Sequence, residues 1–233
     1  ASSLAARDAR GDRARSFVHR TARRLGSVRD RHRLSHHADR RLELFEFIAR
    51  ENVLALARST LGSEPIFHNT QYFFNPLFVS WRGNWHRDTQ FQTPDPELEK
   101  KRVFGDPSVH VRLAFCDDDC LSIVPGSHRR WDSDEEWSIR KGLHGRSADD
   151  DRMPGAKTIA LRAGDAAVFH AWSIHRGRYD ANCQRRALDL IYAIDKADDC
   201  PEDCFGSIDP AVIASLSPEA KIYFAMVLAK RSR

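Results

Sequence analysis

The sequence predicts a mainly β domain, either a sandwich, a jelly roll or a barrel, with helical additions at both ends. Between residues 64 and 195, short β-branched and aromatic runs alternate with turn signals such as Asn75-Pro76 and Gly164-Asp165. On both sides of this region, apolar residues recur at helical spacing. Eight or so short strands are typical of closed or layered antiparallel architectures.

Each expected strand combines β-forming residues with flanking turn residues. The expected strands are residues 66–74, 77–81, 84–91, 109–116, 120–124, 157–161, 166–172 and 186–194. Residues 132–156 are polar and acidic, and we expect them to form a long surface excursion.

Helices are expected over residues 12–30 and 39–61, and after the capping pairs Asp209-Pro210 and Ser217-Pro218. The expected apolar stripes are Leu42, Phe45, Ala49, Val53 and Leu56, ending at Gly62, and then Ile222, Met226 and Ala229. The predicted organisation is a basic helical segment (1–62), a β core (63–195) and a C-terminal helical extension (196–233), all in one domain.

Composition excludes several classes of protein. Hydrophobic residues make up 41% and charged residues 30% of the 233 residues, which is typical of a soluble globular protein. No apolar run is long enough to span a membrane, and the start of the chain lacks the apolar core of a signal peptide. An odd number of cysteines, five, indicates reduced thiols and a cytoplasmic protein.

Positive charge is concentrated near the N-terminus. Residues 7–41 hold twelve arginines against four aspartates, whereas the formal charge of the whole chain is only +4. Such a segment can bind nucleic acid, but a solvated helical face is the commoner reason for it. No nucleic-acid-binding motif accompanies it, so we do not expect a nucleic-acid partner.

Two His-x-Asp triplets are candidate metal-binding motifs. On an extended strand, side chains at i and i+2 share a face, whereas on a helix they point about 200° apart. His37 and Asp39 lie in the helical region and are therefore rejected, while His86 and Asp88 lie in the β region and are retained. Together with His175 they would complete a set of two histidines and one carboxylate. His170 is an alternative to His175.

Arg186 follows His175 by eleven residues, at the start of the apolar run 187–193. An arginine rooted in a core strand is costly unless it meets an anion. Its guanidinium could hold a dicarboxylate through a bidentate pair.

These elements resemble the phytanoyl-CoA dioxygenase-like Fe(II)/2-oxoglutarate oxygenases over about residues 66–194. The matching segments are Trp85-His86-Arg87-Asp88, Val124-Pro125-Gly126-Ser127-His128, Gly164-Asp165, His175 and Arg186. The resemblance implies a double-stranded β-helix, a cupin-like jelly roll. It also implies Fe(II) bound by His86, Asp88 and His175, 2-oxoglutarate bound by Arg186, and O2 as oxidant.

The resemblance implies oxidation of a small-molecule metabolite, with release of succinate and CO2. Halogenases of this kind replace the carboxylate ligand with a small residue, so Asp88 favours hydroxylation or desaturation. Family members often carry Lys-Pro where this chain has Asn75-Pro76, which removes a cation near the co-substrate. No acyl-CoA signature is visible.

Further residues are expected around the pocket. Candidates for contacting 2-oxoglutarate are Asn75, Gln71 and Arg112, and candidates for the substrate pocket are His110, Arg178, Asn69 and Trp85. The rival readings are a non-enzymatic jelly-roll binding module and a nucleic-acid-binding protein that uses the arginine-rich segment.

Overall fold

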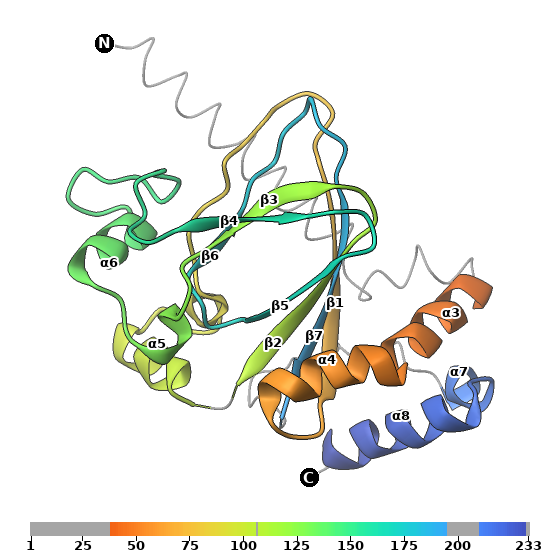
Figure 1. Cartoon of the computed structure of the whole chain (residues 1–233). Coiled ribbons are helices and arrows are strands. Elements are labelled where there is room, and N and C mark those ends of the chain that lie inside the picture. Colours follow the sequence, from red (N-terminus) through yellow and green to blue (C-terminus); the bar gives the residue numbers. More distant parts are fainter. Residues whose placement is uncertain (1–37, 106, 195–209, 232–233) are drawn as a thin grey trace.

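The computed structural model describes residues 38–105, 107–194 and 210–231, and its centre is a pair of facing antiparallel sheets (Figure 1). The major sheet has the order β1 (Ile66–Phe74), β7 (Arg186–Ala193), β2 (Ser108–Ala114) and β5 (Ala166–His170). The minor sheet has the order β4 (Lys157–Leu161), β3 (Asp118–Ile123) and β6 (His175–Gly177). An isolated bridge between His86 and His175 extends this pairing beyond β6. The fold is therefore the double-stranded β-helix that the resemblance implied.

Six of the eight predicted strands are confirmed, and two are wrong. Residues 77–81 contribute only a bridge between Trp81 and Tyr179. Residues 84–91 contribute only the His86 bridge, because the chain turns into the 3-10 helix η1 (Asp88–Phe91). Strand β6 was not predicted, since three residues are too few to show an alternating pattern.

The helices differ from prediction in their number and in their buried faces. Residues 39–61 form two helices, α3 (Ala38–Ile48) and α4 (Glu51–Leu61), because Arg50 is extended. Gly62 ends α4 with a left-handed φ of 68°, as expected. The two C-terminal helices are confirmed as α7 (Pro210–Ala214) and α8 (Pro218–Arg231). The helix predicted over residues 12–30 lies outside the described residues.

Three further elements of the middle region were not predicted: α5 (Pro96–Val103), the 3-10 helix η2 (Ser127–Arg129) and α6 (Asp134–Lys141). Helix α6 occupies part of the expected surface excursion and begins with a capping box between Ser133 and Glu136. No helix in the described ranges is long and apolar enough to cross a lipid bilayer.

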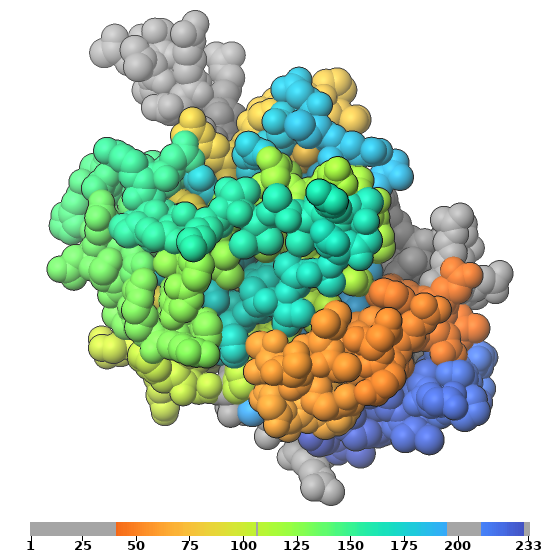
Figure 2. Space-filling view, in the orientation of Figure 1, coloured from red at the N-terminus to blue at the C-terminus, as the bar shows by residue number. Residues whose placement is uncertain are grey.

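Helices α3, α4 and α8 cover the outer face of the major sheet and share one hydrophobic core with it (Figures 1 and 2). The predicted stripes were partly wrong, because Leu56 and Ile222 are 37% and 73% exposed. Packing against the sheet decides which residues of a helix are buried. These buried residues can include neighbours of the residues that form the apolar stripe. The buried residues are Val53, Leu54, Ala57 and Leu61 on α4, and Ala220, Tyr223, Phe224 and Val227 on α8.

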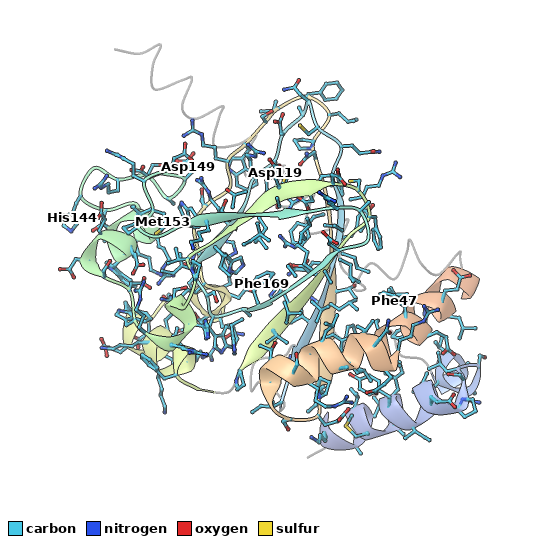
Figure 3. The ribbon with its side chains drawn as sticks, viewed as in Figure 1. Phe47, Asp119, His144, Asp149, Met153 and Phe169 are labelled. Atoms are coloured by element: carbon cyan, nitrogen blue, oxygen red, sulfur yellow. The ribbon has the colours of Figure 1, made fainter. Side chains whose placement is uncertain are left out.

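The space between the sheets holds both apolar and charged side chains. Phe169 of β5 lies there (Figure 3) and packs against Leu121 and Ile123 of β3. Strand β7 alternates, so that Leu190 and Tyr192 join the core under the helices while Asp189 faces the opposite way, into this space. The functional site is built from the polar residues of this interior.

Candidate metal centre

The ligand atoms of His86, Asp88 and His175 all lie within 4.8 Å of one another. Backbone pairing brings the two histidines together, because each donates its N–H to the carbonyl oxygen of the other at 2.9 Å. Arg87 is extended, which turns the Asp88 side chain to the same side as His86. The Asp88 amide donates to the Ala171 carbonyl at 3.1 Å and fixes the start of η1.

Backbone contacts orient both imidazoles towards the common centre. His86 Nδ1 donates to the Asn84 carbonyl at 2.7 Å, and His175 Nδ1 donates to the Ser173 carbonyl at 2.9 Å. In both rings Nε2 therefore carries the lone pair that can ligate a metal. Burial lowers the pKa of both rings, and the pKa of His175 falls to about 3 with His86 adding to the effect. Both are therefore neutral at pH 7, as ligation requires.

The carboxylate of Asp88 has different partners on its two oxygens. Oδ1 lies 3.5 Å from His86 Nε2 and 3.7 Å from His175 Nε2, whereas Oδ2 accepts a hydrogen bond from His110 Nε2 at 2.9 Å. Burial raises the pKa of Asp88, but the hydrogen bond from His110 and the charges of the surrounding histidines outweigh it. They hold the pKa well below its usual range, so the carboxylate is ionised.

A buried network continues from His110. Its Nδ1 lies 2.9 Å from Asp189 Oδ2. Arg112 donates two hydrogen bonds to Asp189, from Nε at 2.6 Å and from Nη2 at 2.7 Å. Burial lowers the pKa of His110, but the hydrogen bonds to Asp189 and Asp88 outweigh it and raise the pKa to about 9. Both ring nitrogens therefore donate at neutral pH.

Arg87 anchors the segment that carries His86 and Asp88. Its guanidinium is fully buried and contacts Asp132 through Nε at 2.9 Å and Nη2 at 2.7 Å. Nη1 also donates to the carbonyls of Ser127 and Trp172, which ties this segment to the chain leading into His175. One arginine thus connects the two parts of the backbone that supply the metal ligands.

Two tight turns bring the remaining backbone into place. A Cβ on Gly83, where φ is 68°, would overlap with the carbonyl oxygen of Gly177, so only glycine lets the segment before His86 approach β6. Gly126, with φ 76°, shapes the turn that presents Ser127, whose hydroxyl accepts the Ile174 amide proton at 2.8 Å. The Pro-Gly-Ser motif therefore supports the segment that ends in His175.

Arg185, and not Arg186, faces the interior. Arg186 is exposed, whereas Arg185 is buried and donates to Asp118 Oδ2 at 3.3 Å and to the Arg178 carbonyl at 3.2 Å. Side chains alternate along a strand, and Arg185 shares the face of Asp189. Arg186 was expected to lie in the interior, whereas the structure places its neighbour Arg185 there.

The guanidinium groups of Arg112 and Arg185 converge on one ring. Their Cζ atoms lie 4.6 Å and 5.0 Å from the centroid of Phe73 on β1. Arg112 Nη1 and Arg185 Nη2 are buried and have no hydrogen-bond acceptor among the described residues. Unsatisfied buried donors of this kind mark a place where an anion fits.

Some of the other predicted pocket residues lie at the site. By alternation from Phe73, Asn69 and Gln71 share the β1 face that looks onto the site, and His110 and Arg112 are buried at it. Asn75 lies in the adjoining turn, where its amide nitrogen donates to the Cys183 carbonyl at 2.9 Å.

The remaining predicted residues lie away from the site. Arg178 pairs with Asp119 at the surface at 2.7 Å, and Trp85 is buried in a separate core with Val124, Ile139, Met153 and Ile174. His170, the alternative ligand, stacks on His128 with ring centroids 4.3 Å apart.

Sequence reasoning missed Asp189, Asp118 and Phe73. Asp189 had a detectable signal, because a lone carboxylate interrupts the apolar run Ala187–Ala193. Burying such a charge is costly unless a cation accompanies it, which pointed to an arginine on the same face. Phe73 had no comparable signal, since aromatic residues are common in strands.

A double-stranded β-helix that carries two histidines and one carboxylate at one end has the donor set of non-haem iron oxygenases. The phytanoyl-CoA dioxygenase (PhyH) family profile matches residues 4–187, and the chain belongs to this family.

Solved structures of similar fold include AviO1 from Streptomyces viridochromogenes Tue57, with 21% identity over 65% of this chain and 61% of that chain and a TM-score of 0.47. The epimerase SnoN from nogalamycin biosynthesis is 21% identical over 64% of this chain and 55% of its own, with a TM-score of 0.45. Iron-bound EctD from S. alaskensis is 17% identical over 72% and 56%, with a TM-score of 0.46. The chain thus matches little more than half the length of each of these proteins. No curated protein matches it.

Proposed function

We propose that this protein is an Fe(II)/2-oxoglutarate-dependent oxygenase that oxidises a small molecule. The observation that carries the proposal is the cluster of His86, Asp88 and His175, with its ligand atoms within 4.8 Å of one another. Two neutral imidazoles and one ionised carboxylate suit Fe(II), and three protein ligands leave positions for a co-substrate and oxygen.

Arg185 holds the distal carboxylate of 2-oxoglutarate, and Arg112 adds a second guanidinium. The proposal is supported by the two buried N–H groups without acceptors, Nη2 of Arg185 and Nη1 of Arg112. Asn69, Gln71 and Asn75 remain candidates for polar contacts with the co-substrate or the substrate.

When bound, the iron and 2-oxoglutarate supply the oxidising chemistry and release succinate and CO2. The residues of this chain bind and orient these groups. The Nε2 lone pairs of His86 and His175 point to one centre, and Asp88 presents Oδ1 to the same centre. The Phe169 ring, with its centroid 5.3 Å from that of His175, excludes water from one side.

The proposed outcome is hydroxylation or desaturation. Asp88 occupies the ligand position that a halide would need, which argues against halogenation. The proposed location is the cytoplasm, a choice supported by free thiols on Cys116, Cys120 and Cys183. The proposed catalytic core is residues 63–195, flanked in the described ranges by helices α3 and α4 on one side and α7 and α8 on the other.

The test is an anaerobic titration of Fe(II)-loaded protein with 2-oxoglutarate, followed by the weak visible charge-transfer band of the complex. We expect one iron and one 2-oxoglutarate per chain, and succinate once air is admitted. Asp88→Ala should lose both the band and succinate formation. No band in the unaltered protein, or full succinate formation by Asp88→Ala, would refute the proposal.

A further inference from the structure

The non-ligating oxygen of Asp88 is held by a residue from a different strand. His110 of β2 donates from Nε2 to Asp88 Oδ2 at 2.9 Å, whereas Asp88 Oδ1 faces His86 and His175. For Asp88 to bind a metal through both oxygens, Oδ2 would have to turn away from His110 and towards the metal, which would weaken this hydrogen bond. The contact therefore selects the orientation in which one oxygen faces the metal and the other faces His110.

His110 is itself held on three sides. Asp189 lies 2.9 Å from Nδ1, Phe169 stacks against the ring at a centroid distance of 4.9 Å, and Asp88 lies 2.9 Å from Nε2. Asp189 cannot swing away, because Arg112, its register partner across the sheet, binds both of its oxygens. The imidazole is thus fixed before any metal arrives, and little conformational entropy is lost when it orients Asp88.

We propose that His110 is a positioning residue that keeps Asp88 a one-oxygen ligand and so preserves the three open positions of the metal. The inference rests on the proposed function, because it takes His86, Asp88 and His175 as the ligands. Without His110 the carboxylate would rotate, and binding through both oxygens would consume one of the open positions. Hydrogen-bond partners of metal ligands typically contribute 10- to 100-fold to metal affinity.

The test uses Co(II), whose visible absorption depends on coordination number and geometry. The protein is titrated with Co(II) alone, and the dissociation constant and spectrum are compared between variants. His110→Phe keeps an aromatic ring but removes both donors. Asp189 keeps its two hydrogen bonds from Arg112 in this variant, so its buried charge still has a partner. We expect Co(II) binding about 10- to 100-fold weaker, with a changed spectrum.

Two further variants separate positioning from packing. His110→Gln retains an amide donor at about the position of Nε2, and should recover the spectrum and part of the affinity. His170→Phe is the matched control. It replaces a second histidine, which is partly buried on β5 and whose ring stacks on His128 and not on a ligand. It should bind Co(II) within about twofold of the unaltered protein.

The outcomes are distinguishable. If the unaltered protein does not bind Co(II), the proposed metal site fails and this inference fails with it. If it binds Co(II) but His110→Phe has the same affinity and spectrum, only the positioning role is overturned. Should His110→Phe be unfolded by circular dichroism, Asp189→Asn replaces it, because that change loosens His110 without removing it. An unchanged spectrum and affinity in Asp189→Asn would then overturn the positioning role.

Discussion

Replacing Arg185 by lysine should weaken 2-oxoglutarate binding without unfolding the protein. Arg185→Leu would leave the buried Asp118 without its partner, and an uncompensated buried carboxylate costs about 3–5 kcal/mol. Lysine keeps the positive charge beside Asp118 but cannot present the planar Nη2 donor, which has no acceptor among the described residues. Losing one charge-assisted hydrogen bond to the co-substrate costs about 1.5–3 kcal/mol, or about 10- to 150-fold in affinity.

The assay is the anaerobic titration of each Fe(II)-loaded variant with 2-oxoglutarate, with the thermal midpoint measured beforehand without co-substrate. Arg186→Lys is the matched control, because Arg186 is the next residue, carries the same charge and is exposed. It should leave the 2-oxoglutarate dissociation constant within about twofold. If Arg186→Lys weakens binding and Arg185→Lys does not, Arg185 does not face the interior and Arg186 does. If neither does, the co-substrate is not held at this end of the strand.

Three other predictions follow from the structure. Arg87→Leu should lower the free energy of unfolding by about 1–3 kcal/mol in urea denaturation, because three backbone carbonyls lose a buried donor while Asp132 keeps Arg140 as its partner; an effect below about 0.5 kcal/mol would contradict this. Burial lowers the pKa of His170 to about 4, so stability should be fully present above pH 6.5 and fall as pH drops from 6.5 through 4. His170→Phe should remove about 1–2 kcal/mol of that loss, a figure reduced for partial solvation, and an unchanged pH profile would argue against it. Deleting residues 1–37 should leave iron stoichiometry at one per chain, since all three ligand candidates lie between residues 86 and 175.

Local patterns predicted the β core well because strand alternation and turn chemistry are properties of a few neighbouring residues. β1 and β4 have the expected bounds, and Gly62 ends its helix as expected. Failures occurred where tertiary contacts override local preference. Residues 84–91 read as a strand, yet the backbone leaves the sheet at Asp88.

The same limit explains the site. The His-x-Asp spacing predicted that His86 and Asp88 share a side, because that relation holds for any extended tripeptide. The choice between Arg185 and Arg186 could not be made this way. Alternation says only that the two point to opposite faces, and which face is the interior depends on how β7 pairs with β1 and β2.

The sequence by itself determined the class of fold, the residue types of the three candidate metal ligands and the family resemblance. These depend on composition and on the spacing of residues that are close in sequence. Only the tertiary structure decided that His110 contacts Asp88, which lies 22 residues away, and Asp189, which lies 79 residues away. Such contacts depend on the register between strands that are distant in sequence, and a shift of one residue would turn each side chain to the other face.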